Sequence, residues 1–188
     1  MTVESGRRDL LKSALQVGIG LTLTPVATIA QGDPASIRPK EGDLLVKVGD
    51  ASLKPLTPDD VPLAAAPVSV WAMDPLDKTV RSGSRLNRVI LVKFNADAIG
   101  AGTRERAAAG VLAFTAICTH SGCDVVDWLS DEQLLYCACH SSRFDPKDGA
   151  RVVDGPAPRS LPALPLKVVD GNLVVARTFT ARVGFEEI

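Results

Sequence analysis

Two short segments hold every cysteine and every histidine of this chain. Residues 118–123 read Cys-Thr-His-Ser-Gly-Cys, and residues 137–142 read Cys-Ala-Cys-His-Ser-Ser. The 188-residue sequence contains four cysteines and two histidines, and sixteen residues separate His120 from Cys137. Thiolates and imidazoles are common ligands of transition metals. Their concentration in two boxes therefore predicts a metal centre or a pair of cross-linked loops.

Three kinds of site are compatible with the boxes, and the first two bind no iron. Cys118, His120, Cys137 and His140 could hold one zinc ion tetrahedrally, but Cys-x-His is tighter than the usual zinc spacing and leaves two cysteines unused. Two disulfides would explain the even number of cysteines in an exported protein, but not the adjacent histidines. The corresponding function would be that of a zinc- or disulfide-stabilised binding module.

The third kind of site is a 2Fe–2S cluster held by two thiolates on one iron and two imidazoles on the other. The sequence has the spacing Cys-x-His-x₁₆-Cys-x₂-His over residues 118–140. This pattern resembles the Rieske iron–sulfur family, in its high-potential branch with a second pair of cysteines. The resemblance extends over about residues 88–176 and is densest at 116–162.

The resemblance implies a ligand for each iron. Cys118 and Cys137 would bind the buried iron, and His120 and His140 would bind the outer iron near the surface. Neutral imidazoles in place of two thiolates remove negative charge beside the irons, which raises the reduction potential. Such centres lie at about −150 to +300 mV, against about −400 mV for plant-type ferredoxins with four cysteine ligands.

The family pattern also implies a disulfide and two side chains that tune the cluster. Cys123 and Cys139 would join the two loops, which limits the freedom of the unfolded chain and requires an oxidising compartment. Ser142 occupies the position of a serine that donates to a bridging sulfide. Phe144 replaces the tyrosine that usually donates to a cysteine sulfur in quinol-oxidising members. Since phenylalanine cannot donate, we expect a lower potential than in respiratory relatives.

Two further positions concern the surface above the cluster. The segment Gly155-Pro156-Ala157-Pro158 resembles the third, cluster-covering loop of the family, in which Pro156 and Pro158 stiffen the backbone and Gly155 permits a tight turn. Ser121 stands where quinol-oxidising members usually carry a leucine. A polar residue at this position weighs against docking into an apolar quinol site.

The N-terminal segment resembles a twin-arginine export signal. It places Arg7-Arg8 before Leu10-Leu11-Lys12, and residues 13–30 carry no charge. We expect residues 1–30 to be a helical signal that is cleaved after Ala30 or kept as a single membrane anchor. The expected location is the periplasmic side of the bacterial inner membrane.

The rest of the chain has an all-β pattern. Residues 31–42 are polar, contain proline and glycine, and predict a linker. Residues 43–188 form the expected Rieske domain, an antiparallel β-sandwich or barrel with a small cluster-binding subdomain at about 116–162. Ala96–Ala109 is the one helical candidate, and Asp170-Gly171-Asn172 predicts a hairpin turn. The expected strands are Asp43–Val48, Pro67–Met73, Arg88–Phe94, Val111–Ile117, Leu134–Tyr136, Leu166–Val169 and Leu173–Ala176.

Charge and composition limit the partners. The formal net charge is −1, so the chain lacks the basic excess of a nucleic-acid-binding protein. The acidic residues after the first box (Asp124, Asp127, Asp131 and Glu132) predict a solvated loop that could face a basic partner such as a c-type cytochrome. No set of residues for nucleophilic catalysis remains once the boxes are assigned.

The resemblance implies one-electron transfer rather than catalysis by the chain alone. The first setting is the iron–sulfur subunit of a quinol–cytochrome c reductase-type complex, with a cytochrome b as the larger subunit. The second is the small subunit of a periplasmic oxidase or dehydrogenase similar to arsenite oxidase, with a molybdenum-type catalytic subunit. Both settings pass electrons to a c-type cytochrome, and only the first uses quinol.

Overall fold

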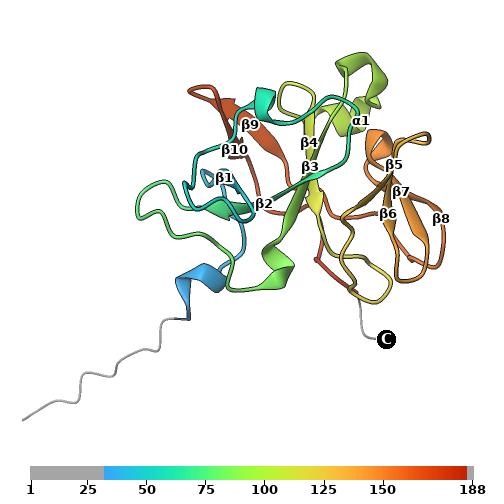
Figure 1. The fold of residues 1–188 in the computed structure, drawn as a ribbon, viewed down its shortest axis with the longest axis horizontal. Coiled ribbons are helices and arrows are strands. Elements are labelled where there is room, and N and C mark those ends of the chain that lie inside the picture. The colour runs from blue at the N-terminus through green and yellow to red at the C-terminus, as the bar shows by residue number, and fades with distance from the viewer. Residues whose placement is uncertain (1–31, 186–188) are drawn as a thin grey trace, which may run out of the picture. The chain divides into compact units, whose positions relative to one another are not determined.

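The computed structural model describes residues 32–185, which form two antiparallel sheets (Figure 1). The strand order is β4-β3-β2-β1-β10-β9 in the six-stranded sheet and β5-β6-β7-β8 in the four-stranded sheet. The strands are β1 (Leu44–Lys47), β2 (Val68–Met73), β3 (Val89–Lys93), β4 (Val111–Thr115), β5 (Asp127–Leu129), β6 (Leu134–Cys137), β7 (Ser142–Asp145), β8 (Arg151–Asp154), β9 (Leu166–Val169) and β10 (Asn172–Val175). The helix α1 spans Ala101–Arg104, and 3₁₀ turns span Pro34–Ser36, Pro58–Asp60, Arg85–Asn87, Ala96–Ala98 and Pro146–Asp148.

The six-stranded sheet curls until its two ends meet. The segment before β9 hydrogen-bonds to β4, the strand at the opposite end of the sheet order. The amide of Thr115 donates to the carbonyl oxygen of Pro162 at 3.0 Å, and the amide of Leu164 donates to that of Ala113 at 2.9 Å. Closure pairs backbone groups that an open edge would expose, so this sheet has the character of a barrel.

Strands β3 and β4 are buried on both faces, which explains their nearly continuous apolar sequences. Val89 and Leu91 face the apolar cluster enclosed by the curled sheet. Ile90 and Val92 face a second cluster, which also contains Leu135 and Phe144 of the smaller sheet. Side chains alternate along a strand, so a strand between two cores needs apolar residues at every position. β3 and β4 therefore form the wall between the two cores.

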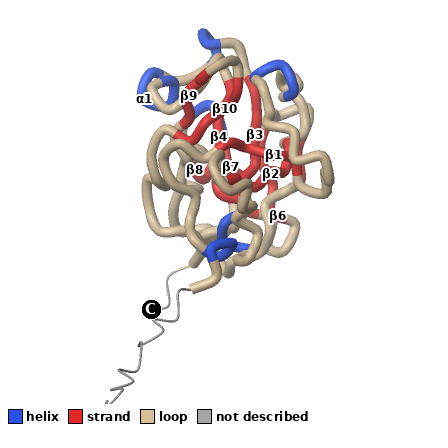
Figure 2. The backbone as a smooth tube through the Cα atoms, turned by 90° about the vertical axis from the view of Figure 1, so that its left-hand side faces the viewer, coloured by secondary structure: helices blue, strands red, loops and turns tan. Residues whose placement is uncertain are grey.

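The four-stranded sheet is an insertion after β4. The chain leaves β4, forms β5 to β8, and returns to the larger sheet at residues 162–164. In Figure 1 the smaller sheet lies to one side of β3 and β4, and Figure 2 shows the long loops (tan) that connect the short strands. Both sequence boxes lie in this insertion, one before β5 and the other between β6 and β7. The fold thus brings the two boxes to the same subdomain.

The sequence predicted the all-β class and seven of the strands, with ends within two residues. The hairpin turn is also present, with positive φ at Asp170 and Gly171. Strands β5, β7 and β8 were not predicted, because each is short and only β7 alternates polar with buried side chains. The helix expected over 96–109 is reduced to a 3₁₀ turn and α1, because Gly100 is extended and donates its amide to the carbonyl oxygen of Lys147.

The described part of the segment expected to be a linker is hydrogen-bonded to the domain, at β10 and at the loop between β2 and β3. The amide of Gly83 donates to the carbonyl oxygen of Ala35 at 2.9 Å, and the amide of Gly42 donates to that of Val175 at 2.9 Å. The expected signal or anchor at residues 1–30 lies outside the described residues. Within 32–185, no helix has the length and apolar character needed to cross a membrane.

Candidate metal centre

The first box is a tight loop that follows β4. The amide of Cys118 donates to the carbonyl oxygen of Cys123 at 2.7 Å, and the amide of Gly122 donates back to that of Cys118 at 3.1 Å. Below these bonds, Ile117 and Asp124 form an antiparallel bridge. The loop therefore closes on itself, with Cys118 at its buried base and residues 119–122 above it.

The second box is the hairpin loop between β6 and β7. Cys137 ends β6 and pairs with Ser142 at the start of β7, so residues 138–141 form the turn. Ser141 adopts a positive φ of 61° within this turn. The hydroxyl of Tyr136 donates to that of Ser141 at 3.0 Å and so connects β6 to the end of the turn. The second loop is therefore held by its own strands.

The predicted ligands form two pairs at different depths. Cys118 and Cys137 are each 1% exposed, and each Cys sulfur is buried in the same apolar cluster. His140 is exposed and His120 is half-buried. The Nδ1 atoms of the two histidines lie 3.2 Å apart, and their rings meet edge to face. The sulfur ligands thus lie inside the subdomain and the nitrogen ligands at its surface.

The Cys137 thiol occupies a site that disfavours its charged form. Burial, and then the hydrogen bond from the Cys118 sulfur, raises the pKa of the Cys137 thiol to about 11. A thiolate at this position therefore requires a neighbouring positive charge, such as that of a bound metal ion. The chemistry of this donor set, two thiols beneath two converging imidazoles, fits the mixed ligand set of a two-iron cluster.

The spacing of the ligand atoms also bears on a single zinc ion. Within residues 32–185, one group of three cysteine, histidine or acidic side chains has all its ligand atoms within 4.8 Å of one another. Its members are Cys123, Cys137 and Cys139. No three of the four predicted ligands meet around one point in this way. Two separate pairs suit two metal ions better than one tetrahedral ion.

Cys123 and Cys139 are joined by a disulfide, the pairing that the family resemblance implied. It connects the first loop to the second across a sequence separation of 16. Their sulfur atoms lie within 4.8 Å of that of Cys137. Because two of the three cysteines form the disulfide, the group does not offer three free thiols to a metal ion. The disulfide thus borders the buried thiol pair.

Ser142 and Phe144 are both completely buried beneath the loops. The Ser142 hydroxyl accepts a 3.2 Å hydrogen bond from the amide of Ala157. Its own proton is then available to a further acceptor, which is consistent with the tuning role expected from the sequence. Phe144 belongs to the same apolar cluster as Cys118 and Cys137. It presents no donor to that cluster.

The segment 155–158 packs directly on the second loop. Gly155 has a φ of +90°, and a Cβ atom there would lie 2.5 Å from the Cα atom of Ser142, so only glycine fits. Ala157 is buried, whereas Pro156 and Pro158 are exposed. The loop therefore approaches the site through its backbone and Ala157, with the prolines on the outside.

Sequence reasoning missed several residues that hold the first loop. The Thr119 hydroxyl donates to the carbonyl oxygen of Arg159 at 2.6 Å. Asp124, which was expected to be solvated, pairs with Arg85 at 2.8 Å and with Arg88 at 3.2 Å. The position of Thr119 between two predicted ligands was a usable signal. The arginines are remote in sequence and gave none.

Comparison with known proteins places this site in a family. The Rieske [2Fe-2S] domain family matches residues 88–165. The cytochrome bc1 complex Rieske iron-sulfur subunit of Streptomyces lividans is 31% identical over 147 residues, which cover 77% of this chain and 85% of that protein. The chain belongs to the Rieske iron–sulfur family. The cofactor of this family's domain is one 2Fe–2S cluster, a group that carries single electrons.

Two other similarities concern proteins of different settings. A Haloferax mediterranei protein, provisionally named a respiratory nitrate reductase Rieske subunit, is 39% identical over 106 residues, or 55% of this chain. The chain spans 47% of that relative's length, about half of it. The plasma membrane Rieske protein PetC3 of Synechocystis is a structural neighbour with 25% identity and a TM-score of 0.37, covering 57% of this chain and 84% of that one.

Membership of the Rieske family removes the zinc- and disulfide-stabilised modules from consideration. The residues that would hold the cluster are Cys118, Cys137, His120 and His140, the four with the family's ligand spacing. When bound, the cluster supplies a reversible one-electron couple. The chain's own contribution would be to bury the thiols of Cys118 and Cys137 and to leave the imidazoles accessible from outside.

Proposed function

We propose that this chain is the iron–sulfur subunit of a quinol–cytochrome c reductase-type complex. The observation that carries the proposal is the imidazole pair of exposed His140 and half-buried His120, with Nδ1 atoms 3.2 Å apart, above two buried thiols. An electron carrier needs one ligand edge at the surface where a partner can approach, and His120 and His140 form that edge. The 31% identical relative named as a cytochrome bc1 complex subunit supports this setting.

A second setting is favoured by two residues at the same edge. Ser121 is exposed, and its hydroxyl lies 3.5 Å from Nδ1 of His140, so a polar group borders the imidazole. Phe144 provides no hydrogen bond to a cysteine sulfur. These features suit the small subunit of a periplasmic oxidase or dehydrogenase that delivers electrons to a c-type cytochrome without binding quinol.

Purification of the intact complex distinguishes the two settings. The chain, tagged at its C-terminus, is isolated from native membranes in mild detergent and from the periplasmic fraction. The first setting predicts recovery with a b-type cytochrome and quinol–cytochrome c reductase activity. Recovery with a molybdenum-containing subunit and no quinol oxidation would overturn it in favour of the second. A tagged His140→Ser variant serves as the control, since it should assemble without the electron transfer.

We also propose export by the twin-arginine route to the periplasmic side of the inner membrane. The support is the pair Arg7-Arg8 before an uncharged segment, together with the disulfide, which requires an oxidising compartment. Changing both arginines to lysine should retain the chain in the cytoplasm. Export of that variant at the wild-type level would contradict the route. Extraction of membranes with carbonate then tests whether the segment remains as an anchor.

A further inference from the structure

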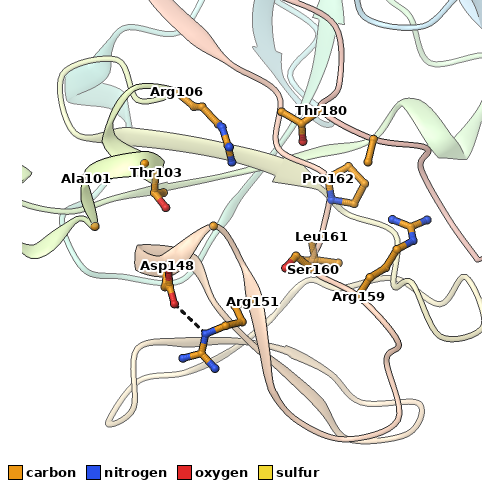
Figure 3. Close-up of a pocket in the computed structure, with 14 residues that line it drawn as sticks. Ala101, Thr103, Arg106, Asp148, Arg151, Arg159, Ser160, Leu161, Pro162 and Thr180 are labelled. Atoms are coloured by element: carbon orange, nitrogen blue, oxygen red, sulfur yellow. Dashed lines mark hydrogen bonds and ion pairs between the residues drawn. The ribbon is translucent and has the colours of Figure 1, made fainter.

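A pocket lined by residues outside the two boxes lies beside α1. Its volume is about 550 Å³, and its lining comes from four segments, residues 100–106, 148–151, 159–162 and 180–181. Figure 3 shows Thr103 and Arg106 on one wall, Leu161 and Pro162 on the other, and Asp148 and Arg151 at the lower rim. None of its residues is a predicted ligand or a disulfide cysteine. The pocket has the size of a small-molecule site.

Two polar side chains of this pocket lack protein partners. Thr103 is only 6% exposed, yet no described residue hydrogen-bonds to its hydroxyl. Arg106 is half-buried, and no described residue forms a hydrogen bond or an ion pair with its guanidinium group. Both groups are therefore free to donate to a molecule in the pocket. A bound acceptor would satisfy both groups.

The two donors converge on an opening above Gly149. A Cβ atom built on Gly149 would lie 3.6 Å from Oγ1 of Thr103 and 3.9 Å from Nη1 of Arg106. The absence of a side chain at Gly149, which has a φ of +65°, keeps this space open. In Figure 3 both side chains point toward the middle of the pocket. The opening therefore lies within reach of a hydroxyl and a guanidinium group.

Further donors surround the same pocket, and its charge is positive. The Thr180 hydroxyl accepts a 3.0 Å hydrogen bond from the amide of Ala163, so its own proton can be donated into the pocket. Among the described lining residues the only carboxylate is Asp148, which is paired with Arg151 at 2.8 Å. The charge of Arg106 is thus not neutralised locally, on a chain whose formal net charge is −1.

We propose that this pocket binds a phosphate group. A phosphate offers several strong acceptor oxygens to donors that approach from different directions, and a guanidinium fork matches two of them. Leu161 and Pro162 provide an apolar wall for a small organic body attached to the phosphate. A soluble organophosphate and a phospholipid headgroup share this chemistry.

Calorimetric titration of the cluster-loaded full chain with inorganic phosphate, at constant ionic strength, tests the proposal. One saturable site is expected. Arg106→Gln should weaken binding about tenfold or more, because a charge-assisted hydrogen bond is lost. Thr103→Val should weaken it severalfold, because it removes the hydroxyl while keeping the shape of the side chain.

The matched control is Arg177→Gln. Arg177 is exposed, lies outside the pocket lining and bonds to no described side chain. The variant loses one positive charge, as Arg106→Gln does, and its phosphate affinity should be unchanged. An unchanged electron paramagnetic resonance (EPR) spectrum of the cluster shows that each variant is folded. Lack of saturation in the wild type, or equal affinity in Arg106→Gln, would overturn the site.

Two competition experiments identify the source of the phosphate. Glycerol phosphate should compete with inorganic phosphate in either case. Vesicles of phosphatidylcholine with phosphatidic acid should bind the wild type more tightly than Arg106→Gln if the occupant is a lipid headgroup. Equal vesicle binding by both proteins, with phosphate binding still sensitive to Arg106→Gln, assigns the site to a soluble organophosphate.

Discussion

The hydroxyl of Thr119 donates a 2.6 Å hydrogen bond to the carbonyl oxygen of Arg159. Thr119 lies between the predicted ligands Cys118 and His120, and Arg159 directly follows the covering segment 155–158. The guanidinium group of Arg159 in turn donates to the carbonyl oxygens of Arg182 and Gly184. One residue thus connects the first loop, the covering segment and the C-terminal part of the domain.

We expect Thr119→Val to destabilise the domain by about 1–2 kcal/mol, because the carbonyl oxygen of Arg159 loses its buried donor while the side-chain shape is kept. Urea unfolding, followed by circular dichroism and by cluster absorbance, measures this change. Thr178→Val is the control, since Thr178 is exposed and should tolerate the substitution within about 0.5 kcal/mol. Equal midpoints for Thr119→Val and wild type would contradict the role of this bond.

Removing the disulfide should destabilise the cluster-binding loops. Replacing both Cys123 and Cys139 by alanine opens a link with a sequence separation of 16, for which a loss of about 3 kcal/mol is expected. The cluster should also be released at a lower urea concentration than in the wild type. The double variant avoids a single free thiol beside Cys137. The same release midpoint in both proteins would show that the disulfide does not support the loops.

Phe144→Tyr should raise the reduction potential. The new hydroxyl would enter the buried cluster of residues that contains Cys118 and Cys137, where donation to a sulfur favours the reduced form. A hydrogen bond of about 1 kcal/mol corresponds to roughly 40 mV for one electron. Protein-film voltammetry measures the shift, with Phe179→Tyr as the control expected to leave the potential unchanged, because Phe179 packs against the other apolar cluster. A potential that does not rise in Phe144→Tyr would count against the prediction.

Asp74 should contribute an acid-sensitive part of the stability. The side-chain hydrogen bond from Lys40, and then the amide of Leu76, lower the pKa of Asp74 from 3.8 to about 2. The unfolded chain therefore binds a proton at higher pH than the folded chain does. The stabilisation is complete above about pH 4 and is lost as the pH falls through about 2.

Comparison with Asp74→Asn tests this dependence. The wild type should be more stable than the variant at pH 7, and the difference in urea midpoint should shrink between pH 4 and pH 2. Asp77→Asn, in the same loop and exposed, should retain the wild-type acid dependence. A difference between wild type and Asp74→Asn that does not change with pH would refute the assignment.

The sequence predicted the parts of this fold that depend on local pattern. Strands such as β3 and β9 have strong β-branched or hairpin signals, and the Rieske ligand spacing is specific enough to indicate the family. The position of β3 and β4 between two apolar cores was not predictable. An apolar run indicates that a strand is buried, but it does not indicate which residues cover each face. Strand β5 was predicted to be a solvated loop, because the acidic Asp127 is typical of a loop. In the structure its neighbour Trp128 pairs with Leu135 of β6.

Contacts between remote segments were likewise beyond the sequence. Arg159 reaches the carbonyl oxygens of residues 182 and 184, and Asp124 pairs with Arg85 and Arg88. Nothing in their spacing marks these residues as neighbours, because the insertion of the smaller sheet brings them together only in the folded chain. The phosphate-binding pocket has the same origin, since its four lining segments are separated in sequence.

The ligand assignment is tested most directly by combined metal analysis and EPR spectroscopy. The chain is purified anaerobically, labelled with ¹⁵N-histidine, and reduced. Two irons and two acid-labile sulfides per chain are expected for the 2Fe–2S cluster, with hyperfine couplings from two histidine nitrogens that disappear in His120→Ser and His140→Ser. Bound zinc, or a protein without labile sulfide and without an EPR signal after reduction, would contradict the account.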